Sequence, residues 1–258
     1  MTPRPNAIAG DLADTVVLVS GASRGIGRDI ARTLARAGAN VAGLARSEDE
    51  LATLRSEIEA AGRRFLPVVA DVTEVEAHAD IIAKVCTWAD RPLDGLVNAA
   101  GTIVRGEPLS IAPADWDLVM DVNARAAFFL CQAAGKSMLE GRGGAIVNVA
   151  SLAGQYATGA SVTYSASKAA LAQLSRVLAV RWAPTVRVNA VGPGYVRTDL
   201  NSSWLDDAEN LRYVLQRTPL ARLGETSDVS ELVAFLLSPR ASYITGQHIL
   251  LDGGWSAQ

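Results

Sequence analysis

Cysteine and histidine are scarce in this sequence of 258 residues, with two of each. Cys86 and Cys131 both fall in segments of helical periodicity, so we expect buried thiols in a reducing compartment rather than a disulfide. His78 and His248 are far apart in the sequence, with no cluster of cysteines or carboxylates around either of them. The sequence therefore predicts no metal site.

Long hydrophobic runs are absent as well. The uncharged segment 143–167 is interrupted by polar side chains, so it predicts no membrane span. Residues 1–14 contain two prolines and no apolar stretch of signal-peptide length, and we therefore expect a cytoplasmic protein. Acidic residues exceed basic ones by only three, 27 against 24, which gives no general attraction to nucleic acid or to anionic lipid.

Apolar side chains are abundant, at 49% of the residues, and they occur in short runs that alternate with longer helical patterns. The runs are apolar on both faces, as in buried parallel strands, and cover 16–19, 41–44, 65–69, 95–97, 145–149, 186–191 and 248–251. The helical patterns cover 25–37, 48–61, 74–89, 114–139, 164–182 and 226–237. This alternation predicts one α/β domain over residues 1–258, a Rossmann-type doubly wound parallel sheet of about seven strands with helices on both faces.

A glycine-rich turn, Ser20-Gly21-Ala22-Ser23-Arg24-Gly25-Ile26-Gly27, follows the first predicted strand and leads directly into a helical pattern. Glycines let the backbone approach a pyrophosphate closely, and a helix N-terminus offers unpaired N–H groups and the positive end of a dipole. The turn therefore predicts a dinucleotide site. A tight strand–helix turn with no ligand is the alternative. The predicted contacts are Gly21, Ser23, Arg24, Gly25, Ile26 and Gly27.

Tyr164 and Lys168 are four residues apart within one helical pattern, so they share a helix face. A free phenol has a pKa near ~10, and acid–base work near neutral pH requires a pKa about 2–3 units lower, or about 3–4 kcal/mol. An ammonium about 4 Å away supplies about 4 kcal/mol at an effective dielectric constant of ~20. The pair thus predicts a proton donor and acceptor; an amphipathic helix with an exposed lysine is the alternative.

The order of these motifs resembles the short-chain dehydrogenase/reductase family in its one-domain form. The matching motifs are Asn98-Ala99-Ala100-Gly101 after the fourth strand, Asn123 in the long helix, Ser151 after the fifth strand, and Pro193-Gly194 followed by Thr198. Ala99 departs from the family pattern, which has asparagine there, and this weakens one turn signature. The resemblance covers essentially the whole chain.

The resemblance implies an oxidoreductase that transfers a hydride between a nicotinamide cofactor and a ketone or secondary alcohol. Tyr164 would give or take the proton on the substrate oxygen, and Ser151 would position that oxygen. Lys168 would lower the pKa of Tyr164 and hold the nicotinamide ribose, and Asn123 would hold a water that links Lys168 to solvent. The implied cofactor contacts are Asp71, Val72, Asn98, Ala99, Ala100, Gly101, Tyr164, Lys168, Pro193, Gly194, Val196 and Thr198.

The end of the second predicted strand bears on the choice of cofactor. Family members that use NAD place an acidic residue there to bind the adenosine ribose, but this chain has Ala45 followed by Arg46. Arg24 in the glycine turn could face the same pocket. Two guanidinium groups without a carboxylate favour a 2′-phosphate, so we expect a preference for NADP(H), with NAD(H) possible.

The substrate is less sharply indicated. Segments 99–105, 115–134 and 252–255 resemble family members that act on gluconate-type sugar acids and polyols. A similar pattern occurs in 3-oxoacyl-[acyl-carrier-protein] reductases, which are the alternative, and Arg105 could meet an acidic substrate or simply lie on the surface. A dinucleotide-binding sensor or scaffold is the non-enzyme alternative, but it would be expected to lack one of the catalytic residues.

Two predictions concern larger features. The weakly patterned segment 195–224 begins just after Pro193-Gly194, and we expect one or two short helices that form a mobile substrate lid, with a rigid surface excursion as the alternative. The helical segments 114–139 and 164–182 carry more apolar surface than one sheet face can cover. The resemblance implies a homotetramer built on them and on the C-terminal strand. The expected partners are a small-molecule carbonyl or alcohol and copies of the chain, with no nucleic acid or membrane.

Overall fold

Seven parallel strands form one sheet in the order β3-β2-β1-β4-β5-β6-β7 in the computed structural model, which describes residues 10–257. This confirms the predicted doubly wound α/β fold, and each strand lies where its apolar run predicts it. The strands are β1 (Val16–Ser20), β2 (Asn40–Ala45), β3 (Phe65–Val69), β4 (Gly95–Asn98), β5 (Gly144–Val149), β6 (Val186–Pro193) and β7 (His248–Leu251). The strand order reverses between β1 and β4, where the carboxyl ends of the strands open a crevice for a ligand.

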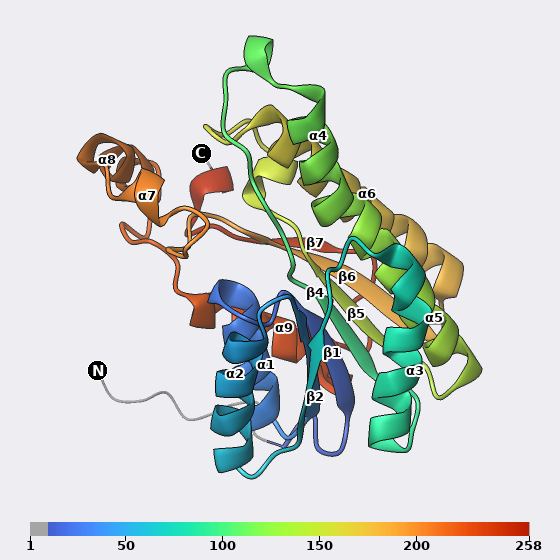
Figure 1. Cartoon of the computed structure of the whole chain (residues 1–258). Coiled ribbons are helices and arrows are strands. Elements are labelled where there is room, and N and C mark those ends of the chain that lie inside the picture. Colours follow the sequence, from blue (N-terminus) through green and yellow to red (C-terminus); the bar gives the residue numbers. More distant parts are fainter. Residues whose placement is uncertain (1–9, 258) are drawn as a thin grey trace.

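Helices cover both faces of the sheet (Figure 1). Helices α1 (Gly25–Arg36), α2 (Glu48–Ala60) and α9 (Thr226–Leu237) pack on one face, and α3 (His78–Ala89), α5 (Ala126–Glu140) and α6 (Val162–Trp182) pack on the other. Helix α4 (Pro113–Met120) lies beside α6. The short helices α7 (Ser202–Leu205) and α8 (Ala208–Gln216) extend away from the sheet, near the C-terminus (Figure 1).

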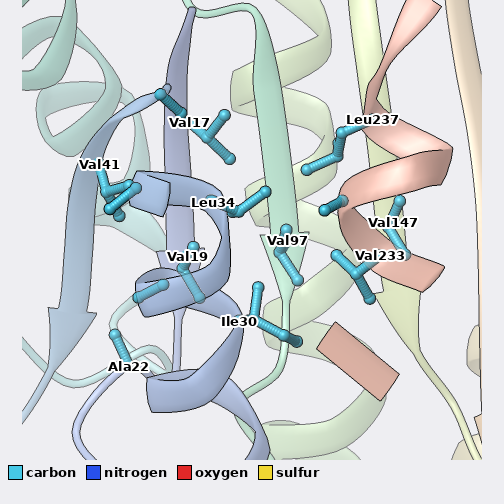
Figure 2. Packing of buried hydrophobic residues seen from close by; sticks show 14 of the residues in the cluster. Val17, Val19, Ala22, Ile30, Leu34, Val41, Val97, Val147, Val233 and Leu237 are labelled. Carbon is cyan, nitrogen blue, oxygen red and sulfur yellow. The ribbon is translucent and has the colours of Figure 1, made fainter. Parts of the chain in front are cut away.

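The core beside the crevice is built of buried apolar side chains. Ile30 and Leu34 of α1 meet Val17 of β1, Val97 of β4 and Val233 of α9, and each of these side chains is buried (Figure 2). Burial of one such side chain contributes about 1.5–3 kcal/mol, so this contact holds the first turns of α1 firmly against the sheet. The glycine turn that precedes α1 is therefore mounted on a rigid base.

The helix predicted over 114–139 is present, since residues 113–140 are helical throughout, but it contains a π-helical turn that the pattern does not predict. A π-helical turn, Asp121–Arg125, separates α4 from α5. Asn123 lies inside this turn, where its side chain is buried and bonded to the backbone of Thr102. A local widening of this kind is common at functional sites because it redirects a side chain without ending the helix.

Four further expectations concern the helix over 74–89, the cysteines, a membrane span and the N-terminal segment. The pattern over 74–89 begins with a 3₁₀ turn, Val75–Ala77, before α3 starts at His78. Cys131 is buried and Cys86 half-buried, and both are free thiols. Within residues 10–257 no helix is both long and apolar enough to cross a bilayer. The interpretation of the N-terminal segment 1–14 concerns mainly residues 1–9, which lie outside the described residues.

Candidate active site

A cavity of about 460 Å³ lies along the carboxyl ends of the strands, at the crevice where the strand order reverses. Its wall contains most of the residues that the sequence predicts for the site. These are Gly21, Ser23, Arg24, Gly25, Ile26, Gly27, Arg46, Asp71, Val72, Ala99, Ala100, Gly101, Ser151, Tyr164, Lys168, Pro193, Gly194, Val196 and Thr198. Two predicted residues, Asn98 and Asn123, are instead buried behind the wall.

The glycine turn forms a cradle that has no room for side chains. Gly21 has a φ of +71°, and a Cβ added there would lie 2.6 Å from the backbone nitrogen of Ala100. A Cβ added at Gly27 would overlap the carbonyl oxygen of Gly21. The residue that precedes α1, Arg24, gives the helix no side-chain cap, so the first N–H groups of α1 keep no such partner. Uncapped N–H groups at a helix start, next to a glycine-rich backbone turn, suit the binding of a pyrophosphate.

Tyr164 and Ser151 lie where this cavity meets a second, smaller one. Ser151 Oγ accepts a hydrogen bond from the backbone N–H of Ala153 at 3.1 Å, which fixes the hydroxyl at the end of β5. Burial raises the pKa of Tyr164, and a hydrogen bond with Ser151 and the charge of Arg105 offset part of that rise. The phenol therefore stays protonated near neutral pH, the form needed to donate a proton to a carbonyl oxygen.

Lys168 is buried, and its Nζ donates to the carbonyl oxygen of Val149 at 2.8 Å. Burial lowers the pKa of Lys168 to about 8, and Nζ is 5.7 Å from the centre of the Tyr164 ring. The expected depression of the Tyr164 pKa by Lys168 is not found among the protein's own groups, because desolvation acts on both side chains and disfavours both charged forms. The lysine nevertheless lies on the cavity wall, with its ammonium held in place.

The two asparagines behind the wall hold it together. The amide nitrogen of Asn123 donates to Thr102 O and to Ser167 Oγ, both at 2.9 Å. Both amide hydrogens are thus used within the protein, and the predicted bond from Asn123 to a water is not made by these donors. Asn98 donates to Asn148 Oδ1 at 2.8 Å, within a buried network that joins β4, β5 and α6.

Arg24 and Arg46 both line the large cavity, but each has a carboxylate nearby. Arg24 is 3.9 Å from Asp199, and Arg46 is 3.6 Å from Asp71. The pKa of Asp71 is lowered, chiefly by its hydrogen bond from the backbone of Thr73 and also by Arg46. Long, exposed ion pairs of this kind contribute about 0–1 kcal/mol, so either guanidinium can exchange its partner for a phosphate.

The smaller cavity has a volume of about 90 Å³ and begins at Ser151 and Tyr164. Arg105 lies on its wall, 5.5 Å above the ring of Trp204, and that ring is stacked on Tyr195 with ring centres 5.7 Å apart. The described residues that line this cavity include one cation, Arg105, and no carboxylate. The cavity therefore favours an anionic substrate.

Several wall residues were not foreseen from the sequence. Leu200 and Asn201 line both cavities, and Thr158 lines the smaller one. Within the segment 195–224, Trp204 borders the smaller cavity, whereas Tyr213 packs against Trp255, with ring centres 5.8 Å apart. Pro193-Gly194 and Thr198 are the motif residues that signal this region in the sequence, since the others belong to no spaced motif.

Comparisons with known proteins agree with this geometry. The family model described as "Enoyl-(Acyl carrier protein) reductase" matches residues 21–256. The chain is 39% identical over 248 residues to the 2-dehydro-3-deoxy-D-gluconate 5-dehydrogenase of Pseudoalteromonas atlantica, covering 95% of this chain and 96% of the relative. It is 37% identical over 246 residues to a tropinone reductase homologue of Arabidopsis thaliana, covering 95% of this chain and 93% of the relative.

Solved structures of other proteins are also similar to this chain over nearly its whole length. A protein from Sinorhizobium meliloti described as a short-chain alcohol dehydrogenase has a TM-score of 0.92 and 41% identity, covering 96% of this chain and 98% of that one. A Beutenbergia cavernae protein described as an NAD(P)-dependent gluconate 5-dehydrogenase, with NADP bound at low occupancy, has a TM-score of 0.91 and 36% identity, covering 97% and 99%. Fold, site geometry and full-length similarity agree: the chain belongs to the short-chain dehydrogenase/reductase family of oxidoreductases.

Proposed function

We propose that the protein transfers a hydride between NADP(H) and a ketone or secondary alcohol on a sugar acid or related polyol. The position of Arg105 carries the choice of substrate class. Its guanidinium lies on the wall of the small cavity that begins at Tyr164, and its charge reaches the Tyr164 phenol. A substrate carboxylate bound there would hold a carbonyl elsewhere in the same molecule near Ser151 and Tyr164.

The large cavity suits NADP(H). The uncapped first turn of α1 and the bare backbone of the glycine turn would hold the pyrophosphate, while Arg24 and Arg46 would hold the 2′-phosphate. Two similar structures hold NADP: the Beutenbergia cavernae protein described as a gluconate 5-dehydrogenase, and an Agrobacterium tumefaciens protein described as a 2-deoxy-D-gluconate 3-dehydrogenase. When bound, the nicotinamide donates or accepts the hydride.

The chain's own residues handle the proton. In reduction, Tyr164 donates its phenolic proton to the substrate oxygen as negative charge develops there, and Ser151 stabilises the same oxygen by a hydrogen bond. Lys168, held by the carbonyl of Val149, keeps a cation beneath this site below a pH of about 8. In oxidation the proton moves in the reverse direction, from the substrate hydroxyl to the oxygen of Tyr164.

A matched pair of substrates tests the proposal. 5-Keto-D-gluconate and L-sorbose differ in a carboxylate against a hydroxymethyl group, and NADPH oxidation by each is followed by absorbance. We expect the carboxylate to be preferred in kcat/KM by about 10- to 100-fold, the range of one charge-assisted hydrogen bond. Arg105→Gln should remove this preference, whereas Arg125→Gln should keep it, because Arg125 lies over Phe129 and lines neither cavity.

Equal rates with the two compounds would contradict the sugar-acid assignment. Turnover confined to 3-oxoacyl thioesters would instead favour the acyl-carrier alternative. NADPH binding with no turnover of any carbonyl compound would point to a sensor or scaffold.

We further propose a cytoplasmic homotetramer. Apolar side chains remain exposed on the helices that the family resemblance assigns to subunit contacts, among them Val177 and Val180 of α6 and Trp116 and Leu118 of α4. Exposed apolar side chains on these helices support association with a second copy. A sedimentation mass near one chain at micromolar concentration would contradict this proposal.

A further inference from the structure

Asn201 lies at the boundary between the two cavities and lines both of them. It stands just before α7, yet its side chain does not cap that helix. The side chain turns back along the chain instead, towards the segment that leaves β6. This orientation suggests that the side chain serves the cavity wall rather than the helix.

The Asn201 amide closes a ring across the turn 196–201. Its Oδ1 accepts from the backbone N–H of Thr198 at 3.0 Å, and its Nδ2 donates to the carbonyl oxygen of Val196 at 2.9 Å. The backbone N–H of Asn201 also donates to the carbonyl oxygen of Thr198 at 3.0 Å. One side chain thus holds the two residues of the wall, Val196 and Thr198, in a single geometry.

The rest of the chain fixes the base of this turn, and Arg197 within the turn donates to Asp206 Oδ1 at 2.6 Å. Val196 is buried and forms an isolated parallel bridge with Gly224, whose N–H donates to Tyr195 O at 2.9 Å. Beyond Val196 the backbone turns over the cavity. A Cβ added at Gly25 would lie 3.6 Å from the side chain of Thr198, so this turn lies close beside the glycine cradle.

The position of this turn affects how the nicotinamide half of the cofactor would bind, as the two ends of the cavity show. The glycine cradle at one side suits the pyrophosphate, and Tyr164 and Ser151 mark the point where a hydride must be transferred. The nicotinamide half of the cofactor therefore has to lie between them, against the wall that runs from Pro193 to Thr198. A shift of about 1 Å in such a wall can reduce a rate about 100-fold, so a clamp on its geometry has a functional effect.

We propose that Asn201 is a positioning residue that shapes the nicotinamide half of the cofactor cavity by clamping Val196 and Thr198. The proposal rests on the proposed use of NADP(H). It assigns Asn201 no contact with the reacting atoms. Its effect should be greatest at the nicotinamide half, because Arg46 and Asp71, which pair with each other at the adenosine end, lie on other segments.

Two ligands separate the halves of the cavity. NADPH carries the nicotinamide, whereas 2′-phospho-ADP-ribose keeps the adenosine, the 2′-phosphate and the pyrophosphate but lacks the nicotinamide. Dissociation constants for both are measured by calorimetry on the unmodified protein, on Asn201→Ala and on Asn201→Ser. The serine variant leaves a short acceptor near Thr198 and no donor for Val196 O, so it tests the clamp with a smaller change of volume.

We expect Asn201→Ala to raise the Kd of NADPH about tenfold, the value of about one hydrogen bond, and to leave the Kd of 2′-phospho-ADP-ribose within twofold. Asn201→Ser should show the same selectivity with a smaller increase. The matched control is Asn210→Ala, which removes an amide that donates to Trp204 O at 3.0 Å but lines neither cavity, and it should change neither constant.

Equal weakening of both ligands by both Asn201 variants would overturn the proposal, since it would show a general loosening of the fold. Unchanged NADPH binding in correctly folded variants would also overturn it. If the unmodified protein binds neither ligand, the proposed function fails first. If it binds both and the variants do not discriminate, the cofactor assignment stands and only the role of Asn201 is lost.

Discussion

The two sides of the active site are built in different ways. The phosphate-binding part of the cofactor side, residues 16–34, is one continuous stretch in which β1, the glycine turn and α1 follow each other along the chain. The substrate side is assembled from separate segments, and its contacts are made by side chains. The first holds its shape through the backbone, and the second through ring stacking and the cation–π contact of Arg105.

The contacts of the substrate side run in a chain. Arg105, between β4 and α4, lies over Trp204 of α7, which stacks on Tyr195 beyond β6. Tyr195 in turn meets Trp255 near the C-terminus, with ring centres 5.2 Å apart, and Trp255 meets Tyr213 of α8. Each such aromatic contact contributes about 0.5–1.5 kcal/mol, so the substrate side can change residue by residue without disturbing the cofactor side.

Tyr164 lies where the two sides meet, so its loss should have the largest effect. Tyr164→Phe removes the proton donor and should lower kcat about 10²- to 10⁴-fold, while the Kd of NADPH stays unchanged. Lys168→Met should lower kcat comparably and also weaken NADPH binding, because Lys168 lines the cofactor cavity. Steady-state rates and NADPH fluorescence titration measure both effects. Near-normal turnover of Tyr164→Phe would refute the assignment.

Gly27→Ala tests the backbone construction of the cofactor side. The added Cβ would overlap Gly21 O, and the overlap must be relieved by moving the turn against a packed core. Overpacking of this kind costs about 1–3 kcal/mol, so the Kd of NADPH should rise about 10- to 100-fold. Gly159→Ala is the control on the substrate side, where an added Cβ meets nothing within 4 Å, and it should leave the Kd unchanged. Equal tolerance of both substitutions would remove the distinction.

Arg46→Asp tests the adenosine end of the cofactor side. It removes a partner for the 2′-phosphate and adds an acceptor for ribose hydroxyls, so the ratio of the NADPH and NADH dissociation constants should shift about tenfold or more towards NADH. The effect is limited by the 78% exposure of the Arg46 side chain. If the unmodified protein binds NADH more tightly than NADPH, the interpretation of Arg24 and Arg46 is wrong.

A smaller effect concerns the ion pairs behind the cofactor side. Hydrogen bonds from Arg32, and to a lesser degree from Arg28, lower the pKa of Glu57 to about 2. A lowered carboxyl pKa adds stability above the unfolded-state pKa of about 4.3, and this stability is lost as the pH falls from there towards 2. The pair is partly exposed, so Glu57→Gln should lower the free energy of unfolding by about 1 kcal/mol near neutral pH.

That change corresponds to a decrease of about 2–4 °C in Tm for a chain of this size. The difference between Glu57→Gln and the unmodified protein should vanish near a pH of about 2, as followed by thermal melts across a pH series. A difference that persists unchanged at low pH would show that Glu57 contributes by packing rather than by charge.

The contrast between the two sides also explains which residues of the site can be predicted from the sequence and which cannot. The glycine turn, Ser151, Tyr164 and Lys168 are found on the cavity wall because strand ends, helix starts and one helix face each have a fixed spacing along the chain. The stacking of Trp204 on Tyr195 has no such spacing. The clamp made by Asn201 is local to residues 196–201, but it belongs to no spaced motif that would mark it in the sequence.

Two local differences between the sequence-based expectations and the structure have the same origin. The π turn at Asp121–Arg125 leaves the apolar periodicity of the flanking helices almost intact, so the pattern predicts one continuous helix. The pKa of Tyr164 depends on burial, which a count of charges along one helix face does not include. Both follow from packing around the site rather than from local sequence.

We propose that the cofactor side is preformed, whereas the segment 195–224 closes over the substrate as a lid. Hydrogen exchange with and without NADPH tests this most directly, because one experiment reports on both sides. We expect strong protection of residues 16–34 in both states, and protection of residues 198–215 that rises when NADPH is added. Equal, strong protection of 198–215 in both states would show a fixed wall and contradict the lid.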